Sequence, residues 1–191
     1  MNITAVSFSY SENSMSYRGL LLMDHYIKFS NIIKMDLPIC DSNKPDGVIP
    51  KEVEELDSIL DKSDVLVFSV PEYTGHYSVG FKNLLDWLVV KGYYNANLGQ
   101  KYSISNKPIF VISFTPSYKG AGDRHFEMTK EILEKLGGKV KKMFVKNDCW
   151  DKLLPGAYQF VEKECREILR KDDEEGSWKE NYKEWNDKWK K

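Results

Sequence analysis

The residues best suited to chemistry gather in a short polar stretch, PEYTGHYS, at positions 71–78. The stretch directly follows the apolar run DVLVFSV at positions 64–70, which is typical of a strand buried on both faces. Loops that leave the carboxyl ends of parallel strands form the ligand sites of open sheets, so we expect this loop to face a ligand. The expected ligand-facing residues are Pro71, Glu72, Tyr73, Thr74, Gly75 and His76.

A second polar loop, SYSENSMS at positions 9–16, follows the apolar run ITAVSF and precedes a helical pattern that begins near Ser16. Free backbone amides and the positive dipole end of a helix favour an anion, and nearby hydroxyls add donors. The sequence therefore predicts a phosphate site here, although any single serine could instead cap the helix. The candidate residues are Ser9, Ser11, Ser14 and Ser16.

A third loop, TPSYKGAGDR at positions 115–124, follows the apolar run PIFVISF. Its glycines permit close approach of the backbone to a flat ligand, and its tyrosine could cover that ligand. Two glycines alone indicate only a turn. The loop is a candidate for ligand binding because it directly follows a strand. Its candidate site residues are Thr115, Tyr118, Gly120 and Gly122.

These loops interrupt a regular alternation of short β-branched runs and amphipathic stretches along the chain. Such alternation predicts an α/β fold, a five-stranded parallel sheet with helices on both faces. The predicted strands cover positions 3–8, 31–36, 64–70, 108–114 and 139–145, the last with the alternation of an edge strand. The predicted helices begin near Ser16 and near Pro50, and then span positions 78–90, 123–136 and 157–171.

The chain divides into a predicted domain at positions 1–171 and a charged, helical C-terminal tail at positions 172–191. Four aromatic residues of the tail recur at intervals of four, three and four, which places them on one helical face. Four roles stay open for this aromatic face: docking on the domain, contact with a partner subunit, disorder, and binding to a membrane surface. Its members are Trp178, Tyr182, Trp185 and Trp189.

Composition excludes several classes of protein. Lys and Arg total 28 against 29 Asp and Glu, with no basic block, which argues against a nucleic-acid partner. Cys40, Cys149 and Cys165 lie far apart and lack metal-ligand spacing, which suits free thiols in a reducing cytoplasm. The sequence has no run of 18 apolar residues, so membrane insertion is not expected. It also has no HExxH or Ser/His/Asp pattern, so neither a metal site nor a hydrolytic site is expected.

The stretch PEYTGHYSVGFKNLLDWL, at positions 71–88, resembles the signature of the NADPH-dependent FMN reductase family. The flavodoxin-like members of that family carry PEYN, GS, a proline, LKN and then a DW pair. The order of elements also resembles the family from residue 2 to about residue 170. The matching residues are Pro71, Glu72, Tyr73, Gly75, Gly80, Lys82, Asn83, Asp86 and Trp87.

This resemblance implies a flavodoxin-like, doubly wound sheet that binds FMN. The first loop would hold the phosphate, the turn at positions 71–76 would lie along the isoalloxazine ring, and the glycine-bearing loop would close the other side. The resemblance also implies hydride transfer from NADPH or NADH through the flavin to a small acceptor such as free flavin, a quinone or an azo compound, by a homodimer or homotetramer. No catalytic side chain is expected, because the flavin supplies the chemistry.

The sequence departs from the family pattern in the first loop, where Phe8 stands for a glycine, Ser11 for an arginine and Ser16 for an asparagine. Thr74 also replaces the asparagine of PEYN. Loss of a guanidinium contact removes about 1.5–3 kcal/mol, so we predict weaker FMN binding. Substitution of this contact by Arg18, one helical turn downstream, is the open alternative. Two alternatives stay open: a flavodoxin-like binding or regulatory module without efficient catalysis, and an electron-carrier flavodoxin, although this chain lacks the latter's TxTGxT loop and acidity.

Several roles within the signature are open. Glu72 could be a solvated turn carboxylate or a subunit contact rather than a catalytic acid, and His76 could line the site or be an exposed loop residue. Lys82 and Asp86 are spaced as an i,i+4 helix pair that could also reach a partner subunit. Trp87 is expected in the core or at an interface, and His25 and His125 fall in or near helices without a metal or triad pattern.

Overall fold

The computed structural model describes residues 1–41, 49–94, 101–117, 120–149 and 165–169. A 5-stranded sheet with the order β2-β1-β3-β6-β7 forms its centre, and every neighbouring pair of strands is parallel. This order is that of doubly wound, flavodoxin-like sheets, and it confirms the predicted fold class. The strands are β1 (Ile3–Ser7), β2 (Asn31–Lys34), β3 (Val65–Ser69), β6 (Pro108–Phe114) and β7 (Lys139–Lys146).

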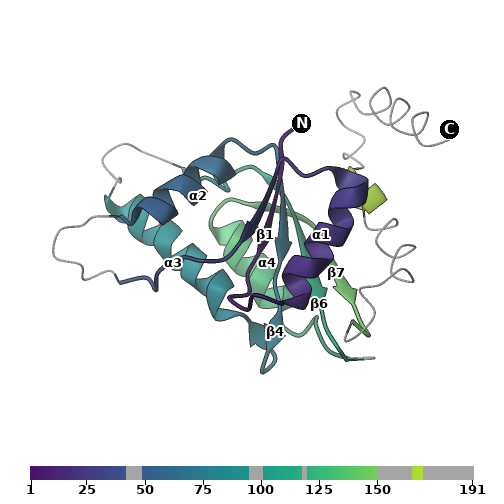
Figure 1. Cartoon of the computed structure of the whole chain (residues 1–191). Coiled ribbons are helices and arrows are strands. Elements are labelled where there is room, and N and C mark those ends of the chain that lie inside the picture. The colour runs from purple at the N-terminus through teal and green to yellow at the C-terminus, as the bar shows by residue number, and fades with distance from the viewer. Residues whose placement is uncertain (42–48, 95–100, 118–119, 150–164, 170–191) are drawn as a thin grey trace.

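Helices cover both faces of the sheet (Figure 1). Apolar residues of α1 and of the helical segment 165–169 form one core with the sheet, and those of α2, α3 and α4 form the other. The four named helices are α1 (Met15–Ile27), α2 (Lys51–Asp61), α3 (Val79–Tyr94) and α4 (Phe126–Lys135). The short segment 165–169 falls within the predicted helix 157–171, whose other residues, like the tail 172–191, lie outside the described residues.

Strand position explains the two kinds of strand sequence. β1 and β3 are buried at every residue, which is why their sequences are apolar without alternation. β2 and β7 end the order of strands and are partly exposed, as the alternation of the β7 sequence predicts. The buried strands bring the loops that follow β1, β3 and β6 to one edge of the sheet.

Several boundaries differ from the prediction: α3 continues to Tyr94 rather than ending at position 90, and β2 ends at Lys34 rather than at position 36. The loop at positions 71–78 holds two short antiparallel strands, β4 (Glu72–Tyr73) and β5 (His76–Tyr77), rather than a simple turn. The helix predicted from position 123 begins at Phe126, and in the loop before it the amides of Gly122 and Arg124 donate to the carboxylate of Glu72. Pro50 occupies the cap position before α2 rather than its first turn.

Helix α1 approaches the sheet closely at Gly19. An ideal Cβ atom at Gly19 would lie 2.3–2.5 Å from ring atoms of Phe114 on β6. Both residues are buried, and real Cβ atoms do not make contacts this short. Only glycine therefore lets α1 and the ring of Phe114 occupy their present positions.

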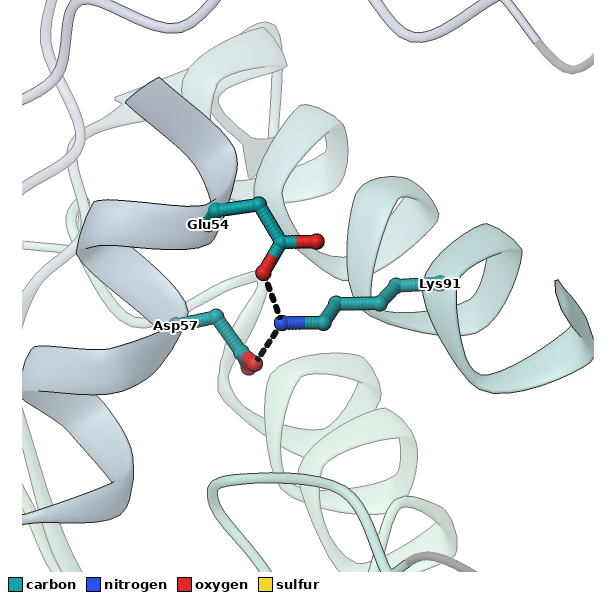
Figure 2. A network of polar contacts seen from close by, with 3 residues as sticks. All are labelled: Glu54, Asp57 and Lys91. Atoms are coloured by element: carbon teal, nitrogen blue, oxygen red, sulfur yellow. Dashed lines mark hydrogen bonds and ion pairs between the residues drawn. The ribbon is translucent and has the colours of Figure 1, made fainter. Parts of the chain in front are cut away.

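An ionic cluster joins α2 to α3 on the other face (Figure 2). Nζ of Lys91 lies 2.6 Å from a carboxylate oxygen of Glu54 and 2.5 Å from one of Asp57. Burial lowers the pKa of Lys91, but hydrogen bonds to Asp57 and Glu54 outweigh this effect, so the net shift is upward. The ammonium group therefore stays charged and holds the two helices together near the carboxyl end of α3.

Candidate functional site

The loops after β1, β3 and β6 meet at one end of the sheet. Figure 1 shows the hairpin that contains β4 at the same end at which α1 and α3 begin. The hydroxyl of Ser78 donates a hydrogen bond of 2.7 Å to the carbonyl of Phe8, which joins the third strand's loop to the first. Glu72 joins the hairpin to the glycine-bearing loop at positions 120–124. The structure thus brings together the three loops that the sequence singles out.

The four serines of the first loop have different environments. Ser14 is the N-cap of α1, where its hydroxyl accepts a 3.1 Å hydrogen bond from the amide of Tyr17. Ser9 is buried and accepts from the amide of Ser11, at 3.3 Å, while the Ser11 side chain is exposed. Ser16 is buried in the first turn of the helix. The capping alternative is therefore realised by Ser14, and Ser11 is the residue of this group that is open to solvent.

Phe8 stands where the family pattern has glycine, and its ring turns away from the loop into the core. The ring packs edge-to-face against Phe68 and against Phe81, with centroids 5.1 Å apart in both pairs. Its carbonyl accepts the hydroxyl of Ser78, which also caps the start of α3 at the amide of Phe81. The substitution of the family's glycine therefore adds core packing without placing a side chain on the ligand side.

The hairpin ends in a tight two-residue turn at Thr74 and Gly75. Both residues have positive φ angles, 53° and 78°. A two-residue hairpin with two positive φ angles is a type I′ turn, which favours Asn-Gly because a β-branched residue is strained there. Thr74 therefore occupies the position at which the family's asparagine is the better residue.

We expect Thr74→Asn to stabilise the protein by about 1 kcal/mol, because asparagine tolerates the left-handed conformation that threonine does not. The substitution loses only an exposed hydrogen bond from the Thr74 hydroxyl to the carbonyl of Tyr73. Urea unfolding at equilibrium measures the change. Thr74→Val is the matched control, because it keeps the branch and should not stabilise; equal stability of the asparagine variant and the natural protein would refute the strain.

Glu72 lies at the start of the hairpin, and one carboxylate oxygen accepts two backbone amides of the glycine-bearing loop. The oxygen lies 2.7 Å from the amide nitrogen of Gly122 and 3.2 Å from that of Arg124. Of the roles left open for Glu72, that of a solvated turn carboxylate does not fit, since the side chain is half-buried and accepts two hydrogen bonds.

The glycine-bearing loop has one closely packed glycine and one open one. Gly122 has a φ of 93°, and an ideal Cβ there would lie 2.8 Å from Cγ1 of Val145 and 3.1 Å from Cγ2 of Thr115. Gly120 has a φ of 66°, and no atom of the described residues lies within 4 Å of its Cβ position. Thr115 is buried, and its hydroxyl accepts from the amide of Ser117. Tyr118, the predicted cover, lies outside the described residues.

Two residues of the signature that lie on α3, Asn83 and Trp87, hold the loops after β1 and β2 in place. The side-chain amide of Asn83 donates to the hydroxyl of Tyr10 at 2.9 Å and to the carbonyl of Pro38 at 2.9 Å, and its oxygen accepts from the amide of Cys40. The indole of Trp87 is buried, as predicted, and donates to the same Pro38 carbonyl at 2.8 Å. Sequence reasoning missed Tyr10 and Pro38, since neither pairs with a residue near it in sequence.

His125 is fully buried beneath the glycine-bearing loop, which its place before a helix did not reveal. Its Nδ1 lies 2.8 Å from the hydroxyl of Thr129, while its Nε2 has no hydrogen-bond partner within the described part of the chain. Burial lowers the pKa of His125, and the nearby Glu72 carboxylate opposes this effect only in part. The imidazole is therefore neutral near pH 7.

Acidification below about pH 6.5 is expected to reduce stability through His125. Its folded-state pKa lies below the unfolded value, so between the two values the unfolded chain binds more protons. Stability is then full above the unfolded pKa and falls as the pH decreases toward the folded pKa. Urea unfolding between about pH 7.5 and about pH 5.5 should show a smaller loss for His125→Gln than for the natural protein.

The exposed His25 provides the control for this experiment. His25→Gln makes the same substitution at an exposed position, so an effect common to both variants would not come from the buried site. Equal pH slopes for His125→Gln and the natural protein would show that His125 does not set the acid sensitivity.

The other polar residues of the signature show no catalytic arrangement. His76 is exposed on β5, and Lys82 and Asp86 form the predicted i,i+4 ion pair on α3. No group of three His, Cys, Asp or Glu side chains able to hold a metal ion occurs in the described ranges. Within those same ranges, no helix combines the length and the apolar character needed to cross a membrane.

Solved structures of flavoenzymes have the same fold. FerB, an NAD(P)H:acceptor oxidoreductase from Paracoccus denitrificans, is 17% identical, with a TM-score of 0.67 over 87% of this chain and 94% of that one. The apo form of the NADH:FMN oxidoreductase EmoB is 17% identical, with a TM-score of 0.63 over 93% and 92%. At these identities the likeness shows the fold alone.

A third structure, general stress protein 14 from Treponema denticola in complex with FMN, is 13% identical, with a TM-score of 0.55 over 88% of this chain and 96% of that one. No curated protein sequence matches this chain. A model of the family described as NADPH-dependent FMN reductase matches residues 1–145, which is most of the chain. The chain therefore belongs to the NADPH-dependent FMN reductase family, whose members are FMN-dependent NAD(P)H oxidoreductases.

Proposed function

We propose that this protein binds FMN at the edge formed by its three loops and passes a hydride from NADPH or NADH to a small acceptor such as free flavin, a quinone or an azo compound. The observation that carries the proposal is the physical connection of the loops. Ser78 ties the signature loop to the carbonyl of Phe8, and Glu72 ties the hairpin to the amide of Gly122. Loops that are fixed to one another provide a preorganised site.

The ring side of this edge fits a flat ligand. Gly120 has open space around its Cβ position, and Thr74 and Gly75 turn the hairpin tightly through positive φ angles. The hairpin and the glycine-bearing loop can therefore approach a planar group with their backbones.

The phosphate side also fits, though with fewer charged donors than the family pattern. The first amides of α1 have no acceptor within the helix, and the Ser14 hydroxyl serves only the amide of Tyr17. Buried hydroxyls of Ser7 and Ser69, at the carboxyl ends of β1 and β3, have no partner among the described residues, as suits an edge that receives a polar ligand. Helix amides and hydroxyls would hold the phosphate here, without the family's guanidinium.

When bound, FMN supplies the hydride chemistry of the site. The protein's part is to orient the ring and to stabilise charge. Backbone amides of residues 73–75 would donate to the polar edge of the ring and favour the added negative charge. The described part of the loops offers no side-chain nucleophile or general base in a catalytic arrangement, and none is needed for this role.

Titration of the purified protein with FMN, followed by flavin fluorescence, tests the proposal. We expect saturable binding and oxidation of NADPH or NADH only when FMN and an acceptor are present. Binding without nicotinamide oxidation would favour a regulatory module, and reduction only by a protein donor would favour an electron-carrier flavodoxin. Absence of both binding and oxidation would overturn the proposal.

The resemblance also predicts a homodimer or homotetramer, and the scattered cysteines favour a reducing cytoplasm. Both stay predictions. Lys82 and Asp86 pair with each other on the surface of α3, so they are available to a partner subunit only by breaking or sharing that pair. The role of the aromatic tail depends on residues 172–191, outside the described part of the chain. Sedimentation of the full chain and of a chain ending at position 171 distinguishes a subunit contact from a docked tail.

A further inference from the structure

The carboxylate of Glu72 joins segments that are 50 residues apart in sequence. It belongs to the first residue of β4, and its Oε2 accepts the amide of Gly122 at 2.7 Å. The same oxygen accepts the amide of Arg124 at 3.2 Å, just before α4 begins. A carboxylate bound by two backbone amides ahead of a helix gains from charge-assisted hydrogen bonds and from the helix dipole.

The side chain of Arg124 lies between the glycine-bearing loop and the hairpin tip. Its Nη2 donates a 3.0 Å hydrogen bond to the carbonyl of Gly120, and its Cδ lies 3.9 Å from the ideal Cβ position of Gly75 at the hairpin tip. The loop therefore meets the hairpin at its base through Glu72, and the stem of Arg124 lies near the hairpin tip. We call these contacts of Glu72 and Arg124 the loop clasp.

The packing of Gly122 links the loop clasp to the position of Gly120 in the candidate site. Gly122 packs against Thr115 and Val145 with no room for a side chain, so its placement also fixes the open Gly120 two residues earlier. A shift of this loop would change the distance between Gly120 and the hairpin. That distance sets the width available to a planar ring.

We propose that Glu72 is a positioning residue that fixes the glycine-bearing loop opposite the hairpin and thereby sets the affinity for FMN without contacting the flavin. This inference rests on the proposed function for its ligand. Without the carboxylate, the amides of Gly122 and Arg124 lose their acceptor, and FMN binding must then order the loop. Glu72→Ala is expected to weaken FMN binding about tenfold, or about 1.4 kcal/mol.

Three variants separate positioning from other roles. Glu72→Ala removes the acceptor, whereas Glu72→Gln keeps a neutral oxygen at the same reach and should restore most of the affinity. Glu127→Ala removes an exposed carboxylate from the first turn of α4, which has no bond to the described part of the loop. This variant should bind FMN normally. FMN titrations and turnover at saturating FMN are measured for each variant.

A positioning role predicts a higher Kd for FMN in Glu72→Ala but an almost unchanged kcat once FMN saturates. A large fall in kcat with an unchanged Kd would instead place Glu72 in the chemistry and overturn the proposal. Equal Kd values for Glu72→Ala and the natural protein would also overturn it.

Hydrogen exchange in the protein without FMN tests the clasp independently of the proposed function. The amides of Gly122 and Arg124 should exchange at least about tenfold faster in Glu72→Ala than in the natural protein, with Glu72→Gln between them. Unchanged exchange would overturn the clasp even if FMN binds. Faster exchange in a protein that binds no FMN would keep the clasp, and it would overturn both the ligand proposed for this site and the role of Glu72 in FMN affinity.

Discussion

Ser11→Arg is expected to tighten FMN binding by about ten- to a hundredfold. The side chain of Ser11 is exposed in the loop before α1, at the position where the family pattern has arginine. A guanidinium there would add charge-assisted hydrogen bonds to the phosphate, worth about 1.5–3 kcal/mol. The natural loop offers only amides and hydroxyls, and part of those are used internally by Ser9 and Ser14.

Fluorescence titration of FMN at low and at high salt measures this gain. Ser11→Gln is the matched control, since it adds a long polar side chain without charge and should change the affinity little. The advantage of arginine should shrink at high salt, because screening weakens an exposed charge pair. Equal affinity of the arginine and glutamine variants would show that the phosphate does not lie beside position 11.

Gly19→Ala is expected to destabilise the protein by about 2 kcal/mol, although alanine is the better helix former by about 1 kcal/mol. The added methyl group would lie 2.3–2.5 Å from the ring of Phe114, so α1 or the ring must move. Both residues are buried in the core between α1 and the sheet, where little space is free for such a movement. Overpacking therefore outweighs the gain in helix propensity.

Urea unfolding of four proteins tests this clash: the natural chain, Gly19→Ala, Phe114→Leu and the double variant. Leucine at position 114 removes the ring atoms that the methyl group would meet. The two substitutions together should therefore cost less than the sum of their separate costs. Additive costs, or a Gly19→Ala protein as stable as the natural one, would show that the core adjusts without strain.

Hydrophobic patterning was sufficient to predict the sheet. The runs that became β1, β3 and β6 are apolar because each strand is buried on both faces, and the alternating β7 lies at an edge. The same reasoning could not find β4 and β5, since strands of 2 residues are too short to show a period. An asparagine before Gly75 would have signalled the hairpin, but the sequence has threonine there.

The site was predicted as a set of loops but not as a set of contacts. The position of the loops follows from the order of strands, and the capping role of Ser14 follows from its place before a helix. The partners of Glu72 are backbone amides far along the chain, and no residue type marks them. Burial of His125 likewise depends on the loop that folds over it, because its own neighbours in sequence are mostly polar.

Asn83 uses both ends of its amide group, one as acceptor for Cys40 and the other as donor to Tyr10 and Pro38. Asp and Leu have nearly the same size, yet neither can both donate and accept there. Either substitution would therefore break at least one of these contacts and weaken the fold at this point. Asn83 and Trp87 thus hold the segment at Pro38 and Cys40 against α3 whether or not a ligand is bound, so this half of the signature reports on the fold rather than on the chemistry.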